Sequence, residues 1–129
     1  MVVITRAIAT LSVIDLVRAR RFYEGKLGLK LLQAHTNGKY QEALYEAGSG
    51  SKILLYQRPS SKSDHTALAF EVNNIEQTVR DLREKGVVFE EYDLPGLKTV
   101  DGIANMPNGR AAWFKDAEGN ILSLAQIGK

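Results

Sequence analysis

The stretch Val13-Ile14-Asp15-Leu16 has a counterpart later in the chain, Val72-Asn73-Asn74-Ile75. In both stretches an apolar strand residue leads into a polar residue that can cap a helix, followed by an apolar first helical residue. The flanking elements repeat too, in the order strand, helix, strand, strand, strand. Strand–cap–helix junctions are common and could coincide by chance, but repetition of the whole order favours an internal duplication.

The first repeat, residues 1–58, is predicted to be a βαβββ module. A helix is expected between a cap at Asp15 and a stop at Gly28, because apolar residues recur there at helical spacing. Strands are expected over residues 3–13, 29–35, 40–47 and 52–56, where apolar and polar residues alternate or turn signals bound an apolar run. The polar stretch 59–64 is the plausible linker to the second repeat.

The second repeat, residues 65–129, is predicted to be another βαβββ module within a single domain of residues 1–129. Asn74 is expected to cap a helix, with Gln77 as its partner in a variant of the capping box. Strands are expected over residues 66–72, 87–92, 110–115 and 121–126. The stretch 93–108 is expected to be an irregular connection, and long connections often serve as lids or binding loops.

Composition limits the classes of protein that the chain can belong to. Its 129 residues are 44% hydrophobic and carry a net charge of +2, which fits one folded domain and excludes a disordered chain. No apolar run approaches the length needed to cross a membrane, and no signal peptide is expected. The chain has no cysteine, so disulfides and thiolate sites are excluded and a cytoplasmic location is predicted. The basic residues form a solvated helix face rather than a nucleic-acid-binding stripe.

Four motifs occur in order along the chain: Val13-x-Asp15-Leu16, Phe22-Tyr23, Leu27-Gly28-Leu29 and the run from Trp113 to Leu122. Together they resemble the vicinal oxygen chelate superfamily, which includes glyoxalase I, bleomycin resistance proteins and extradiol dioxygenases. The resemblance covers nearly the whole chain. It departs from the family at Ala117, where a proline is usual. It implies an α+β fold in which two βαβββ modules form a curled mixed sheet around a central cup, and it implies a homodimer.

Family enzymes hold a divalent metal in the cup through His and Glu side chains. The resemblance places the four ligand positions at Ile8, Leu54, Ala67 and Ser123. Three of these side chains have no donor atom, and one hydroxyl is a poor ligand for a divalent metal. We therefore expect no metal site and no cofactor. His35 and His65 are expected to be ordinary surface histidines.

Strand alternation predicts which side chains line the cup. Glu71 is a weak candidate for catalysis among them: it is either a general base with a raised pKa or a hydrated carboxylate at the rim. Tyr56 is a second weak candidate for an acid–base group. Trp113 is either a stacking platform or a packing residue. The predicted lining consists of Ile8, Thr10, Ser12, Leu54, Tyr56, Ala67, Ala69, Glu71, Trp113 and Ser123, together with Ile121 and Ala125.

Three functions remain open from the sequence. The favoured one is a metal-free protein that binds a small, partly apolar molecule, as bleomycin resistance proteins do. The second is a superfamily enzyme, of lyase or dioxygenase type, that acts on a small carbonyl or aromatic compound without a metal or with ligands that the alignment misses. The third is an interaction module without a ligand. A small-molecule ligand and a homodimer partner are expected, but no nucleic acid or membrane.

Overall fold

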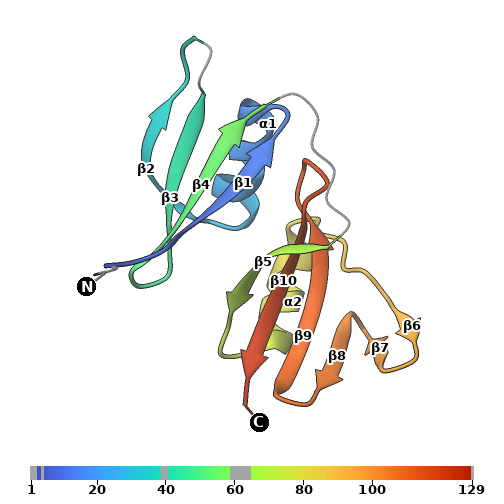
Figure 1. Ribbon diagram of the computed structural model, residues 1–129. Coiled ribbons are helices and arrows are strands. Elements are labelled where there is room, and N and C mark those ends of the chain that lie inside the picture. The colour runs from blue at the N-terminus through green and yellow to red at the C-terminus, as the bar shows by residue number, and fades with distance from the viewer. Residues whose placement is uncertain (1–2, 4, 39–40, 59–64, 129) are drawn as a thin grey trace. The chain divides into compact units, whose positions relative to one another are not determined.

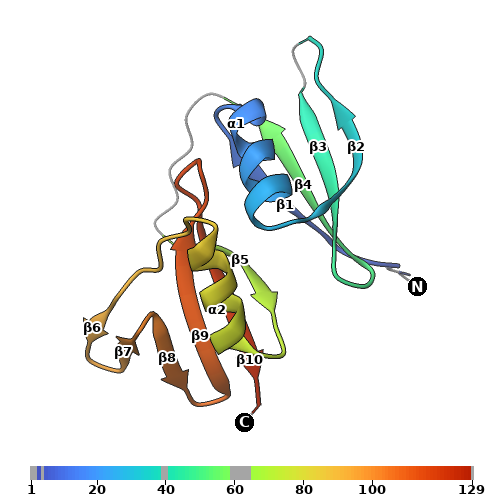
Figure 2. The same cartoon turned by 180° about the vertical axis from the view of Figure 1, so that it is seen from behind.

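The computed structural model describes residues 3, 5–38, 41–58 and 65–128, so the predicted linker lies outside the described residues. The chain divides into two compact units, Met1–Lys62 and Ser63–Lys129. Each unit has one mixed sheet with a helical segment packed on one of its faces (Figures 1 and 2). The predicted α+β class is confirmed.

The first unit has a four-stranded sheet in the order β1-β4-β3-β2. The first and last strands, β1 and β4, run parallel, while the other neighbours are antiparallel. The strand β1 begins later than expected from the sequence. The elements are β1 (Ile8–Val13), α1 (Leu16–Arg20), the π-helical segment η1 (Arg21–Lys26), β2 (Lys30–His35), β3 (Glu42–Ala47) and β4 (Ser51–Gln57).

The second unit repeats this arrangement in a six-stranded sheet of order β5-β10-β9-β8-β7-β6. Its parallel pair is β5 and β10, and two short strands extend the far edge. The elements are β5 (Thr66–Glu71), α2 (Ile75–Glu84), β6 (Asp93–Leu94), β7 (Leu97–Val100), β8 (Ile103–Met106), β9 (Gly109–Lys115) and β10 (Ile121–Ile127).

Two predictions for residues 87–108 are wrong. The expected strand over 87–92 is reduced to an isolated bridge between Phe89 and Phe114, whose ring centroids lie 5.4 Å apart. Val87 and Phe89 are buried by packing, so the apolar alternation in this stretch does not arise from a strand ladder. The expected irregular connection forms β6, β7 and β8, which are too short to show a period of two.

The start of the helical segment in the first unit is held from two directions. Asp15 caps it as predicted, because its Oδ1 accepts a hydrogen bond from the backbone N–H of Arg18 at 3.1 Å. Gln57, at the end of β4, accepts a hydrogen bond from the N–H of Leu16 at 2.7 Å through its side-chain oxygen. The last strand therefore fixes the point at which the helix begins.

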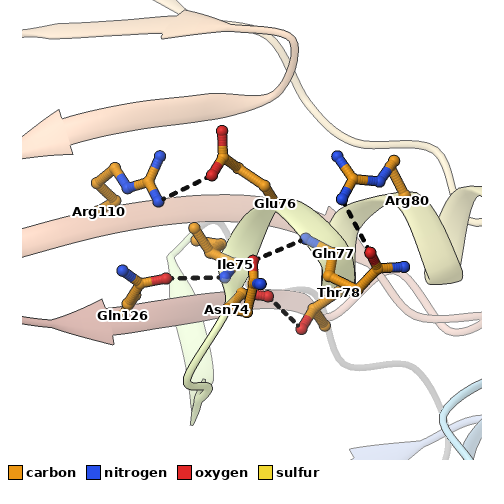
Figure 3. A network of polar contacts seen from close by, with 8 residues as sticks. All are labelled: Asn74, Ile75, Glu76, Gln77, Thr78, Arg80, Arg110 and Gln126. Atoms are coloured by element: carbon orange, nitrogen blue, oxygen red, sulfur yellow. Dashed lines mark hydrogen bonds and ion pairs between the residues drawn. The ribbon is translucent and has the colours of Figure 1, made fainter.

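The second unit repeats both contacts (Figure 3). Asn74 Oδ1 accepts from the N–H of Gln77 at 3.1 Å, and Gln126 Oε1 accepts from the N–H of Ile75 at 2.8 Å. The expected capping box is only half formed. The amide nitrogen of Gln77 donates to Asp81 at 2.7 Å instead of turning back to the cap.

The core of each unit lies between its sheet and its helix. In the first unit Leu11, Val13 and Leu55 point to the helix side and are at most 5% exposed. In the second unit Leu122 and Phe114 do the same beneath α2. Because side chains alternate along a strand, the remaining residues occupy the sheet face that carries no helix, here called the open face of each module.

Candidate functional site

The open face of the first module contains every site residue predicted for that module. Partners across a strand pair share one face, and β1 residues Ile8, Thr10 and Ser12 are in register with β4 residues Lys52, Leu54 and Tyr56. The intervening residues Leu11 and Val13 are buried on the helix side. The predicted set thus lies together: Ile8, Thr10, Ser12, Leu54 and Tyr56.

The register continues across β3 and β2 and sorts this face into rows. The middle row has an apolar centre, because Leu54 is in register with Leu44. Thr10 is the outer neighbour of Leu54, and Gln33 is the outer neighbour of Leu44. The next row is wholly polar. It runs across all four strands and consists of Ser12, Tyr56, Glu42 and His35.

This polar row was only half predicted from the sequence. Ser12 and Tyr56 were expected, but Glu42 and His35 were not assigned to a site. His35 is exposed, as expected, but it is the register partner of Glu42 on the open face. The strand-end position of His35 beside the Asn37-Gly38 turn was the available signal. The row itself depends on how β2 pairs with β3 and how β3 pairs with β4, and this register is not contained in the sequence of any one strand.

The open face of the second module carries the other predicted residues. Ser123 is in register with Ala69 on β5 and with Trp113 on β9, and Ala125 is in register with Glu71. Ser123 is only 6% exposed, whereas Glu71 is exposed at the end of the edge strand β5. Ala67, Ala69 and Glu71 alternate along β5 on this face.

Trp113 forms an aromatic pair that the sequence did not predict. Its ring meets Tyr92 edge-on, with centroids 5.6 Å apart and planes at 82°. Tyr92 is half-buried, and burial together with the nearby Glu90 charge raises the pKa of its phenol. Trp113 itself is half-buried, so part of its ring surface is open to a ligand. Edge-on packing by Tyr92 orients the indole ring.

Metal-binding side chains are sparse on both faces. Within the described residues, no group of three or more His, Asp or Glu side chains is arranged to hold a metal ion. At the four positions implied by the family, Ile8 is 48% exposed hydrocarbon and Ser123 offers a single hydroxyl. Leu54 and Ala67 offer no donor atom.

The family assignment rests on a match over residues 6–124 to the glyoxalase/bleomycin resistance protein/dioxygenase superfamily. The chain belongs to this superfamily. None of the curated proteins matches it. No helix in the described ranges is long and apolar enough to cross a membrane.

Several solved structures share this fold. UcmS2 is 23% identical with a TM-score of 0.70, and 94% of this chain and 98% of that chain are covered. TnmS3, described as an antibiotic-binding protein from Streptomyces sp. CB03234, is 23% identical with a TM-score of 0.66, covering 95% and 97%. The fosfomycin resistance protein FosX from Listeria monocytogenes, in a complex with Mn(II) and a dihydroxypropylphosphonic acid, is 19% identical with a TM-score of 0.69, covering 100% and 95%.

Proposed function

We propose that this superfamily member binds a small, partly apolar molecule on its open faces without using a metal ion. The observation that carries the proposal is the row structure of the first open face. An apolar centre at Leu44 and Leu54 lies next to a row of hydroxyl, phenol, carboxylate and imidazole groups. Such a surface buries an apolar body and orients it by a few hydrogen bonds.

The donor set does not fit the metal of the family enzymes. A divalent transition metal needs imidazole, carboxylate or thiolate donors, usually three or more. The implied positions supply hydrocarbon at Ile8, Leu54 and Ala67, and one hydroxyl at Ser123. No step of the proposed function depends on a metal.

Aromatic ligands are the favoured class for the second module. Trp113 is held by Tyr92 with part of its ring exposed, and small residues surround it on the same face. Ala69, Ala125 and Ser123 are small side chains on this face, and Ser123 is the register partner of Trp113. TnmS3, which shares this fold, is described as binding an antibiotic, and aromatic antibiotics are therefore suitable first probes.

The test is a titration of the protein with daunorubicin and with metal-free bleomycin, following the fluorescence of the single tryptophan and, in parallel, the heat of binding. We expect saturable binding that is unchanged by EDTA. Trp113→Phe and Tyr56→Ala are each expected to weaken binding about tenfold or more. Lys85→Ala, at the exposed end of α2 on the helix side of the second module, is the matched control. Loss of binding in EDTA, restored by Mn(II) or Zn(II), would refute metal independence.

An enzymatic alternative is favoured by one observation, the presence of Tyr56, Glu42 and His35 in a single row. These groups can donate and accept protons. Glu71 is a weaker candidate for a general base because it is exposed at the end of an edge strand. Mass spectrometry of the probes after prolonged incubation distinguishes the alternatives. Conversion that Tyr56→Phe abolishes supports an enzyme, and probes recovered unchanged support binding alone.

A homodimer and a cytoplasmic location complete the proposal. The first follows from the family resemblance, and the second is compatible with the absence of cysteine. Light scattering coupled to size-exclusion chromatography tests the dimer, which should have about twice the 14.3 kDa mass of one chain. A single peak at the monomer mass across the micromolar range would contradict it.

A further inference from the structure

A cavity of about 460 Å³ lies on the helix side of the first module, away from its open face. It is lined by α1, by the segment η1, and by the residues that directly follow β2 and precede β3. Its volume is in the range of small-molecule sites. Its lining combines apolar and charged side chains: Leu16, Val17, Arg20, Arg21, Glu24, Gly25, Thr36 and Gln41.

The charges in this cavity are not balanced. Arg20 Nε donates to Glu24 Oε2 at 2.8 Å, and the buried Tyr45 hydroxyl donates to the same oxygen at 2.7 Å. Burial alone would raise the pKa of Glu24, but the bonds from Arg20 and Tyr45 outweigh it and hold the pKa below its ordinary value. Glu24 is therefore ionised and neutralises Arg20. In the described part of the chain no carboxylate pairs with Arg21, whose positive charge remains uncompensated.

The backbone that lines the cavity is unusual in two ways. The segment η1 is π-helical, with the N–H of Leu27 bonded to the carbonyl of Phe22 at 3.1 Å. Such turns are rare in proteins as a whole, and those that do occur are often found at functional sites. It also contains Gly25, a residue that weakens helices. A side chain at Gly25 would meet no atom within 4 Å, and its φ is not positive, so neither packing nor backbone geometry requires glycine there.

We propose that this cavity is a second ligand site, which takes a small molecule with an apolar body and a single carboxylate-type anionic group. Arg21 pairs with the anion, as a guanidinium does with planar carboxylates. Leu16 and the 58%-exposed Val17 cover the apolar body. The missing side chain at Gly25 keeps the floor of the site open. The charges of Glu24 and Arg20 balance each other, so Arg21 is the one remaining positive charge in the lining and matches a single anionic group.

The probe pair is 1-naphthaleneacetate and its neutral amide, which share an apolar body and differ in charge. Both are titrated into the ¹⁵N-labelled full chain and followed by amide chemical shifts. We expect the acetate to shift the amides of residues 16–25 and of Thr36, and to bind about tenfold more tightly than the amide. Shifts confined to the open faces, equal binding of the two probes, or no binding of either at millimolar concentration would overturn the proposal.

Two variants test the roles of single residues. Arg21→Gln should weaken binding of the acetate about tenfold and leave binding of the amide unchanged. Arg18→Gln removes the same charge from the same helix outside the cavity lining and is the matched control, with less than a twofold effect. If the two variants weaken acetate binding equally, general electrostatics and not this site attracts the anion.

Gly25→Ala provides a readout that a purely structural role would not give. Alanine is the better helix former, so the variant should raise the midpoint of thermal unfolding by roughly 2–4 °C. The added methyl group should at the same time weaken binding of both probes about fivefold or more. A more stable variant that binds less well supports a site kept open at the expense of the helix. A less stable variant, or one that binds both probes as the wild type does, refutes it.

Discussion

The glutamine at the end of each parallel strand pair is predicted to fix the start of each helix. Gln57 Oε1 lies 2.7 Å from the N–H of Leu16, and Gln126 Oε1 lies 2.8 Å from the N–H of Ile75. The first N–H groups of a helix have no partner within the helix, so these side chains satisfy donors that are otherwise open. The perturbation is Gln126→Leu, which removes the acceptor while keeping an apolar stem of similar size.

The cost follows from the geometry of this contact. One hydrogen bond is lost, worth about 1 kcal/mol, and a partly buried N–H is left to find water, so the total is about 1–2 kcal/mol. With a urea dependence of about 2 kcal/mol per molar for a chain of this size, the midpoint should fall by roughly 0.5–1 M. Gln126→Glu keeps an acceptor and places a negative charge at the helix start, so it should retain stability at neutral pH.

Trp113 is the only tryptophan and lies in the second module, so its fluorescence during urea unfolding reports on the module that holds Gln126. Hydrogen exchange gives a local readout, because the amide of Ile75 should exchange faster in Gln126→Leu and not in Gln126→Glu. If the leucine variant unfolds within about 0.3 kcal/mol of the wild type and the amide of Ile75 keeps its protection, the glutamine does not hold the helix and the reasoning is wrong.

Three further predictions concern single contacts. Tyr45→Phe should lower the free energy of unfolding by about 1–2 kcal/mol at neutral pH, because it removes the hydrogen bond to Glu24. Burial, followed by the contacts with Glu24, raises the pKa of Tyr45 in the folded protein, so the wild type should lose stability as the pH rises above about 10. Urea titrations at increasing pH should show this loss in the wild type and not in the variant. Gly109→Ala should lower the free energy of unfolding by at least about 2 kcal/mol, since the new Cβ would lie 2.0 Å from the carbonyl oxygen of Gln126 at a φ of +150°. A midpoint of thermal unfolding equal to that of the wild type would show that the backbones of β9 and β10 can separate here without cost. Asp116→Ala should cost about 2–3 kcal/mol, because this buried carboxylate accepts two backbone N–H bonds in the β9–β10 turn; a change below about 0.5 kcal/mol in chemical unfolding would mean that the turn holds itself.

Much of the fold was predictable because its signals are local. The alternation along β1 placed Ile8, Thr10 and Ser12 on the face away from the helix, and Leu11 and Val13, which alternate with them, are buried. The caps at Asp15 and Asn74 were visible as short polar residues ahead of apolar stripes, and both accept the expected backbone bond. Each of these features depends on a few neighbouring residues, which is why the sequence was sufficient.

The prediction for residues 87–106 was wrong because the structure of this stretch depends on contacts with residues far away in the chain. Its apolar residues Val87 and Phe89 are buried by contacts with distant residues such as Phe114, so a strand-like pattern appeared where no strand forms. The following strands are two to four residues long and depend on partners, as Thr99 does on Ala104 and Glu91. Contacts of this kind produce no periodic pattern of apolar residues in the sequence.

The chain's own sequence determined that two similar modules exist, where their helices begin, and which residues of each edge strand face away from the helix, because helix caps and strand alternation are properties of adjacent residues. Only the tertiary structure decided that His35 and Glu42 join Tyr56 in one row, and that Arg21 and Gly25 line a cavity beside a neutralised Glu24. Register and cavity shape are set by contacts between segments far apart in the chain, and a shift of one residue would turn each side chain to the opposite face.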